Sequence, residues 1–185
     1  TGVVRVARTA GIAAALRSVG GLDLEVEEVD VAGPPTSGAI RAAGWAEAAV
    51  LLAGLRGEPE VRVVDPSMGG RATASVADGA VRVVVDAGAA LDEVVLRSYA
   101  VGAAHQALGW VTSEGLAVDE DGTVHDRTIR SFGVLRAVDT PSIEVEVVDS
   151  GGPPVRAGDA VFAAVAGAVW VAQGCPADWP TGRSL

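Results

Sequence analysis

The sequence predicts an α/β (α+β) fold in which helices pack on a mixed sheet, and three observations favour it. Short runs that alternate Val with charged residues indicate half-buried strands, because side chains alternate between the two faces of a strand. Longer Ala- and Val-rich runs with apolar residues at helical spacing separate these strands. Asp78-Gly79 and Asp121-Gly122 stand between apolar runs, as in two-residue hairpin turns. Strands alternating with long helices, plus two β-hairpins, predict this architecture.

The expected elements cover most of the chain. Two helices begin after a residue suited to capping, Thr9 in one case and Asp92 in the other. The expected strands are 3–8, 24–31, 60–65 and 143–149, with hairpins over 71–86 and 109–133. The expected helices are 9–19, 37–57, 92–109 and 160–174.

Composition and charge exclude several classes of protein. A chain of 185 residues with 49% apolar residues has the size of a single domain over 1–185 with a substantial core. A net charge of −10 argues against nucleic acid as a partner, since phosphate binding needs a basic face. Apolar runs are too short to span a membrane, and a signal-peptide pattern is missing, so a cytoplasmic protein is expected. The lone Cys175 excludes an internal disulfide.

One segment is repeated in the chain. LEVEEVDVAGPP and IEVEVVDSGGPP align without gaps, which places Asp30 on Asp149 and Pro34 on Pro153. Each copy is a strand, an Asp, a glycine turn, Pro-Pro and then a helix. The repeat suggests two related strand–turn–helix halves whose turns face one crevice. Chance recurrence of such patterns in a Val- and Gly-rich chain is the equal alternative.

The C-terminal half resembles a known family. GAAHQALGWVTSEGLAVDEDGTV is similar to the Gly-Ala-x-x-Gln-Gly-Leu-Gly helix and the following Glu-bearing hairpin of the xanthine dehydrogenase/aldehyde oxidase large subunits. SFGVLRAVDTPSIEVEVV and GGPPVRAGDAVFAAVAGAV continue the resemblance, the latter on the family's Gly-Glu-Pro-Pro loop. The match is strong over 102–185 and weaker over 1–101, where SGAIRAAGWAEAAV resembles a shortened Ser/Arg-bearing loop. These subunits of the molybdenum hydroxylases bind molybdopterin, and the chain corresponds to their last lobe.

The departures from the family concern its cofactor-facing positions. Gly152 stands where the family has the Glu that acts as base, and general-base help is worth about 10²–10⁴-fold in rate. Tyr99 stands where the family places a Gln against the cofactor, and ARTAGI over 7–12 lacks the Gln of the family's Gly-Gln-Gly loop. From these losses we expect no bound cofactor. The vacated crevice is then expected to bind a small organic molecule, with non-redox isomerisation or cyclisation as the natural chemistry if the protein is an enzyme.

The candidate site residues lie near the two turns and on the helix over 92–109. Tyr99 and His105 are the catalytic candidates, and each has a plainer alternative: a plug of the crevice for Tyr99 and a core-edge side chain for His105. The candidate ligand-binding residues are Ser37, Arg41, Glu47, Gly151 and Gly152. Ser37 and Arg41 could instead be a helix cap and a solvated charge. Two distant histidines without carboxylates at ligand spacing predict no metal site.

Two other functions remain open from the sequence. The chain could be an accessory or split subunit of a molybdenum hydroxylase, in which a partner supplies the missing loops. It could also be a structural or regulatory protein without catalysis. Trp170 and Trp179 are large apolar groups in an aromatic-poor chain and could anchor an interface. A homo-oligomer or a partner subunit is therefore expected.

Overall fold

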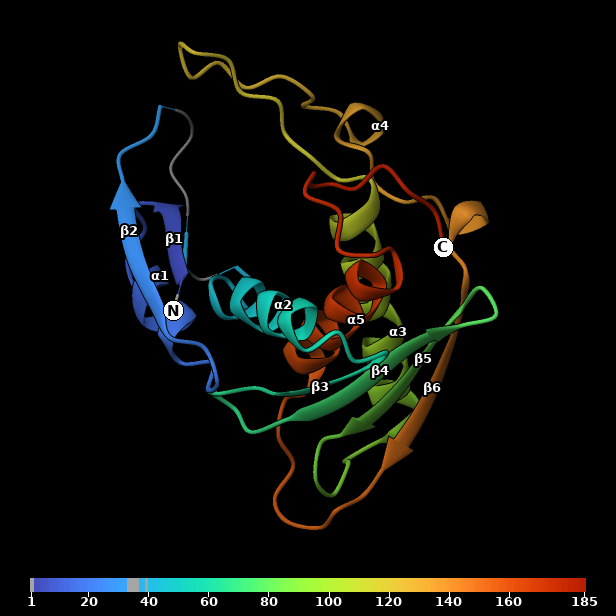
Figure 1. The fold of residues 1–185 in the computed structure, drawn as a ribbon. Coiled ribbons are helices and arrows are strands. Elements are labelled where there is room, and N and C mark those ends of the chain that lie inside the picture. The colour runs from blue at the N-terminus through green and yellow to red at the C-terminus, as the bar shows by residue number, and fades with distance from the viewer. Residues whose placement is uncertain (1, 33–36, 39) are drawn as a thin grey trace.

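The computed structural model describes residues 2–32, 37, 38 and 40–185, and it has one main sheet, one small sheet and the helices between them (Figure 1). The strands are β1 (Gly2–Ala7), β2 (Leu24–Val29), β3 (Glu60–Val64), β4 (Arg71–Ala77), β5 (Ala80–Asp86) and β6 (Ser142–Val148). The α-helices are α1 (Ile12–Arg17), α2 (Trp45–Arg56), α3 (Glu93–Thr112), α4 (Ile129–Phe132) and α5 (Gly158–Ala172), with a short 3₁₀ helix at Ala137–Asp139. The predicted α/β class with a mixed sheet is confirmed.

The main sheet has the strand order β3-β4-β5-β6, antiparallel except for the parallel β5–β6 pair. Its buried face carries the small and β-branched residues Val61, Val63, Ala72, Ala74, Val81, Val83 and Val85. Between these, charged and polar residues alternate on the other face, as the sequence pattern predicts. Asp78 and Gly79 both have positive φ, 53° and 72°, as the predicted hairpin turn requires.

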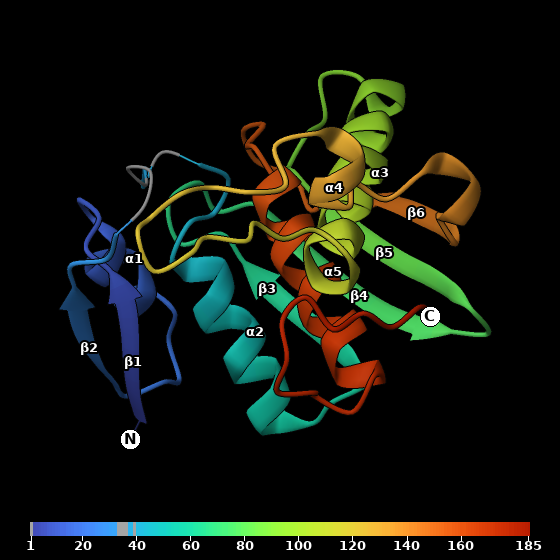
Figure 2. The same cartoon turned by 90° about the horizontal axis from the view of Figure 1, so that it is seen from above.

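Helix α5 is the centre of the molecule. It lies between α2 and α3 and packs on β3 and β4 (Figure 2). Its residues from Ala160 to Val169 are all buried. Small residues allow this close packing, since a Cβ on Gly167 would lie 3.1 Å from both Ala53 and Val61. The core is therefore built from Ala and Val at short interhelical distance rather than from aromatic side chains.

A small N-terminal lobe lies beyond α2 in both views (Figures 1 and 2). It consists of the parallel pair β1–β2 and helix α1, which contacts α2. In the two segments of the predicted repeat, β2 precedes α2 and β6 precedes α5. The first turn of the repeat, at 33–35, lies outside the described residues.

Two helices begin later than the sequence suggests because a tertiary contact overrides the local pattern. The expected helix over 37–57 starts only at Trp45, after Gly44 with φ 84°. A Cβ on Gly44 would lie 3.0 Å from Ile12 and Ala15, so α1 presses directly on this backbone. Helix α1 in turn begins after Gly11, and Thr9 does not cap it.

The second expected hairpin, over 109–133, is mostly irregular, and helices α3 and α4 occupy its two ends. Helix α3 continues to Thr112, because Val111 is fully buried and Trp110 stacks on Phe162 at a ring distance of 5.1 Å. Between residues 113 and 133, all of which the structure describes, strand pairing is limited to the single bridge Val118–Val124.

The C-terminal segment folds back over α3 and α5. Trp179 packs edge-on against Trp110 at 4.7 Å and against Trp170 at 6.3 Å. The Trp170 indole N–H donates to the carbonyl of Pro176 at 3.0 Å. Trp170 and Trp179, expected at an interface, thus pack within the chain, although Trp179 stays 37% exposed.

Among the described helices, none combines the length and the apolar character needed to cross a membrane.

Candidate functional site

A cavity of about 540 Å³ lies where α3 and α5 begin, and we call it the α3–α5 cavity. Its wall from the start of α3 is mainly apolar, and the opposite wall is the segment that leads into α5. The lining residues are Arg41, Ala87, Ala90, Leu91, Asp92, Val95, Leu96, Tyr99, Pro154, Val155, Arg156, Ala157, Gly158 and Asp159. Its volume falls in the range of about 300–1,000 Å³ that is typical of ligand sites.

The turn at 151–154 is fixed against the end of β5. The Ala89 N–H donates to the carbonyl of Gly152 at 3.2 Å, and the Val155 N–H donates to the carbonyl of Ala87 at 2.9 Å. Gly88 lies so close to the turn that a Cβ there would be 2.4 Å from the Pro153 carbonyl oxygen. This backbone contact positions the wall of the cavity from Pro154 onward.

Asp86, the last residue of β5, anchors the same turn through its side chain. Its Oδ1 accepts hydrogen bonds from the Gly88 N–H at 3.0 Å and from the Ser150 hydroxyl at 2.9 Å. The Asp86 side chain is only 12% exposed. The Gly88 N–H, followed by the Ser150 hydroxyl, lowers the pKa of Asp86 below its usual value.

We expect Asp86→Asn to lower stability in a pH-dependent way. A carboxyl group whose pKa is depressed in the folded state adds stability above its unfolded pKa, near 3.8. That stability is lost as the pH falls through the folded value. Urea midpoints of wild type and variant should therefore differ most at pH 7 and converge below about pH 4. A difference that stays constant with pH would show that the Asp86 charge does not stabilise the turn.

The two glycines of the turn do not line the cavity. Gly151 and Gly152 have φ values of 77° and 92°, which side-chain-bearing residues rarely adopt. No atom lies within 4 Å of a Cβ built on either residue. A side chain at position 152 would therefore be strained by the backbone conformation. Gly151 and Gly152 were ligand-binding candidates. They form the turn, and the residues that line the cavity begin at Pro154.

Arg41 and Tyr99 are brought together by the α3–α5 cavity, as the sequence predicts for a common crevice. Arg41 Nη1 lies 3.7 Å from Asp159 Oδ1, an ion pair that solvent still reaches. Tyr99 lies one helical turn after Val95 and is 68% exposed, so its ring does not plug the cavity. The polar side chains of the lining are those of Arg41, Asp92, Tyr99, Arg156 and Asp159.

Asp92 and Asp159 are lining residues that the sequence did not single out as functional. The Asp92 side chain accepts from the Val95 N–H at 3.0 Å and caps α3. Asp159 stands in the first turn of α5 and pairs with Arg41. The sequence feature that could have pointed to Asp159 is its position at the start of the helix that follows the turn at 151–154. Both carboxylates already have partners, so neither is a free proton acceptor.

The catalytic candidate His105 lies elsewhere. Its Nε2 is 3.1 Å from the Leu135 carbonyl oxygen, and it is not among the residues that line the cavity. Partial burial raises the pKa of nearby Glu114, and the charge of His105 opposes this rise. Glu114 folds back over Gly109, where its Oε1 would be 2.2 Å from an added Cβ. The structure therefore gives His105 and Glu114 a packing role at the far half of α3.

Two ligand-binding candidates also lie outside the cavity lining. Ser37 precedes α2 by several residues and does not cap that helix. Glu47 is in the first turn of α2, and desolvation by neighbouring atoms raises its pKa. Its residue surface is nevertheless exposed, so solvent still reaches this side chain.

No cluster of three or more His, Cys, Asp or Glu side chains that could hold a metal ion occurs in the described ranges. The fold is an α/β lobe, and the α3–α5 cavity is a ligand-sized hollow at the start of two of its helices.

Part of the chain matches a known family model. Residues 71–141 match the model of the family described as molybdopterin cofactor-binding domain. The matched range runs from β4 through α3 to the residue before β6. Over this range, which is less than half of the chain, the sequence is similar to a molybdopterin cofactor-binding domain.

Solved structures of such enzymes are similar at low identity. Quinoline 2-oxidoreductase from Pseudomonas putida 86 is 20% identical over 58% of this chain, with a TM-score of 0.46. A Cu,Mo-CO dehydrogenase is 19% identical over 54%, with a TM-score of 0.42. Reconstituted CO dehydrogenase from Oligotropha carboxidovorans is 18% identical over 54%, with a TM-score of 0.41. The matches cover 14–16% of those chains. No curated protein matches the chain.

The expectation of a relative without a cofactor is wrong. The matched family model describes a cofactor-binding domain, and it points to molybdopterin. The losses at Tyr99 and Gly152 had suggested otherwise, but single positions do not decide whether a domain binds its cofactor. Isomerisation or cyclisation was expected only because of that absence, and this expectation loses its premise.

Proposed function

We propose that this chain forms one wall of a molybdopterin site in a molybdenum hydroxylase-type oxidoreductase, with the remaining contacts supplied by a partner subunit or by further parts of a longer chain. The proposal is supported by the overlap between the family match and the lining of the cavity. The family match over 71–141 contains the start of α3, and the start of α3 forms the apolar wall of the α3–α5 cavity.

The residues present fit such a group in their chemistry. Molybdopterin carries a phosphate and several hydrogen-bonding heteroatoms, which require cationic and neutral donors. Arg41 supplies a guanidinium group and Tyr99 a phenol, and the α5 N-terminus lacks a side-chain cap. Arg41 and Tyr99 would hold the group. When bound, it supplies two-electron oxidation and reduction.

The roles of the chain's own residues follow from their positions. Arg41 neutralises negative charge in the cavity, and Asp159 keeps its guanidinium near the start of α5. Leu91 and Val95 offer an exposed apolar surface on one side, which a bound group would cover. No proton acceptor comes from the turn, because Gly152 has no side chain and its φ of 92° disfavours one. The base is therefore proposed to come from outside this turn.

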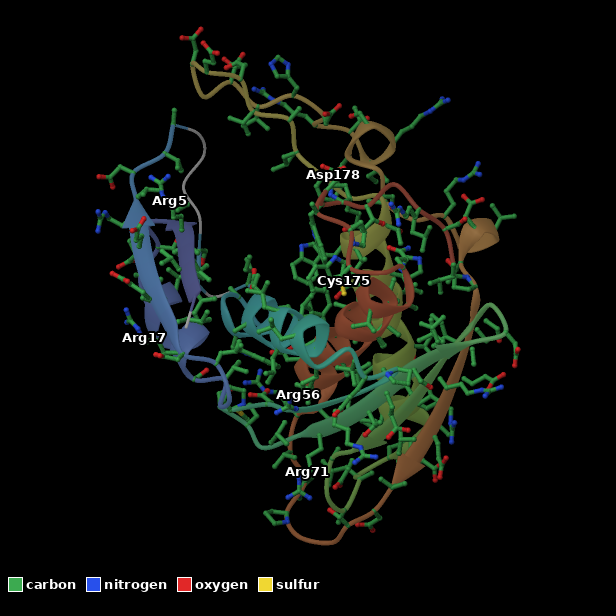
Figure 3. All side chains as sticks on the ribbon, in the orientation of Figure 1. Arg5, Arg17, Arg56, Arg71, Cys175 and Asp178 are labelled. Carbon is green, nitrogen blue, oxygen red and sulfur yellow. The ribbon has the colours of Figure 1, made fainter. Side chains whose placement is uncertain are left out.

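Cofactor retention tests the proposal without a measurement of activity. The protein is purified from a host that makes the molybdenum cofactor, together with its partner subunits, and molybdenum and pterin are quantified per chain. We expect Arg41→Ala to lower both by about fivefold or more, since a charged hydrogen bond contributes ~1.5–3 kcal/mol. Arg5→Ala is the matched control, because Arg5 is an exposed arginine on β1 and does not line the cavity (Figure 3).

Equal molybdenum in wild type and Arg41→Ala would remove Arg41 from the site. Absence of molybdenum and pterin from every preparation would overturn the proposed function itself.

A further inference from the structure

A second hollow, of about 330 Å³, runs along β3, and we call it the β3 groove. All five residues of β3 line it, together with one side of α2 and the connection between α1 and β2. The lining residues are Ser18, Val19, Gly20, Trp45, Ala49, Leu52, Ala53, Arg56, Glu58, Glu60, Val61, Arg62, Val63, Val64 and Pro66. Successive residues of a strand point to opposite faces of a sheet. A hollow that touches all five therefore passes along the edge of the strand.

This edge of β3 is open to pairing. β3 is the outermost strand of the main sheet and pairs only with β4. Across the described part of the chain, no backbone group of 60–64 bonds to any element other than β4. An unpaired edge presents a row of N–H and C=O groups that another extended chain can use.

The walls of the groove give the chemistry of an occupant. Trp45, which is 7% exposed, and Leu52 supply an apolar surface from α2. Arg56 follows Leu52 by one helical turn, and both side chains lie within 4 Å of a Cβ built on Gly21. Figure 3 shows Arg56 at the end of α2, where the chain turns toward β3.

The charges along the groove differ in whether they have partners. Arg62 is paired with Glu60 at 2.5 Å and is not available to a ligand. Arg56 is exposed and has no ion pair among the described residues, and it lines the groove beside the apolar wall. Glu58 also has none, but it lies beyond Gly57 in the exposed connection to β3. A carboxylate opposite Arg56 is the complementary group.

We propose that the β3 groove binds an extended segment of a partner chain, which adds to the edge of β3 as a fifth strand of the main sheet. The segment carries an apolar side chain for the Trp45–Leu52 wall and a neighbouring acidic side chain for Arg56. Residues of α2 and of the 18–20 connection line the groove beside β3. Main-chain bonds then give affinity and the two side-chain contacts give specificity.

Amide chemical shifts in the ¹⁵N-labelled protein test the proposal with a defined probe, the peptide acetyl-Val-Glu-Val-Thr-Val-amide. We expect shifts that saturate at millimolar peptide and are centred on 60–64 and on the Trp45 side of α2. N-methylation of alternate peptide amides should weaken binding by about tenfold, because it removes ladder hydrogen bonds worth ~1 kcal/mol each. A peptide with Lys in place of Glu should bind about fivefold more weakly.

Arg56→Ala provides the matched variant in the protein. It should lose the preference for the Glu peptide over the Lys peptide and keep the dependence on free peptide amides. Arg5→Ala, which removes an exposed arginine that does not line the groove, should change neither. The proposal is overturned if the shifts centre elsewhere, if N-methylated and free peptides bind equally, or if no shift appears at 5 mM peptide, well above a ~1 mM Kd. The peptide test does not involve the cofactor, so its outcome is independent of the proposed function.

Discussion

Gly88→Ala should lower the free energy of unfolding by about 3 kcal/mol or more, the larger part of it from a clash with backbone. The added Cβ would lie 2.4 Å from the carbonyl oxygen of Pro153 and 3.2 Å from its carbonyl carbon. These atoms belong to the turn at 151–154, which cannot move without breaking the bonds from Ala89 to Gly152 and from Val155 to Ala87. A positive φ of 66° adds strain for any residue with a Cβ.

Gly79→Ala is the control that separates conformational strain from the clash. Gly79 has a φ of 72°, close to that of Gly88, but no atom lies within 4 Å of its built Cβ. We expect this variant to lose only about 1 kcal/mol. Urea unfolding followed by far-UV circular dichroism gives both values on one scale. Similar losses in the two variants would mean that the turn yields and that Gly88 matters only for its φ.

A functional consequence follows from the position of Gly88. The turn that it contacts continues into Pro154 and Val155, which line the α3–α5 cavity. Under the proposed function, Gly88→Ala should therefore retain less molybdenum per folded chain than Gly79→Ala. The comparison is made well below the unfolding transition, so that global instability does not contribute.

Strands of the main sheet could be predicted from the sequence because their pattern is local. Val61 and Val63 point into the core while Glu60 and Arg62 point out, and this alternation depends only on the period of a strand. The hairpin of β4 and β5 could be predicted for the same reason, since its turn needs two residues of positive φ and the chain offers Asp78-Gly79.

The starts and ends of helices were harder to predict, because contacts distant in sequence decide them. Gly44 breaks the apolar run before α2 where α1 approaches, and nothing in the local spacing indicates that approach. Trp110 extends α3 into the expected hairpin because Phe162, far along the chain, stacks against it. Periodicity shows that a helix is possible, whereas packing partners decide how far it runs.

The candidate site was predicted in part. Arg41 and Tyr99 lie far apart in sequence, and the repeat and the family resemblance predicted that both lie near one crevice. In the structure, both residues line the α3–α5 cavity. His105 lies on the same helix as Tyr99 but faces Leu135, a difference in direction that residue type cannot reveal. Asp159 was overlooked because an acidic residue in a first helical turn is common for reasons of the helix dipole alone.

Asp65→Ala should lower the free energy of unfolding by about 2–4 kcal/mol, because three donors lose their common acceptor. Asp65 is 2% exposed, and its Oδ1 accepts from the Ser67 N–H at 2.8 Å, the Ser67 hydroxyl at 2.7 Å and the Met68 N–H at 3.0 Å. Its own N–H and carbonyl close the loop from β3 to β4 through Gly70 and Gly69. Urea unfolding at pH 7 measures the loss.

Ser67→Ala is the matched control, since it removes one of the three donors and leaves the acceptor in place. It should cost about 1 kcal/mol. Asp65→Asn keeps one acceptor oxygen and should fall between the two. If Asp65→Ala is within about 0.5 kcal/mol of wild type, the backbone bonds alone hold the loop and the carboxylate is dispensable.

The loop that Asp65 organises also meets the start of α5. A Cβ on Gly70 would lie 2.3 Å from the Arg156 carbonyl oxygen and 2.6 Å from Ala157 Cα, so the loop and the α3–α5 cavity wall share a backbone contact. If Asp65→Ala loosens the loop at 65–70, the start of α5 at 156–159 should therefore be destabilised before α3. Hydrogen exchange in Asp65→Ala is expected to quicken first at 65–70 and 156–159, and slow exchange at 156–159 would show that the two segments are not coupled.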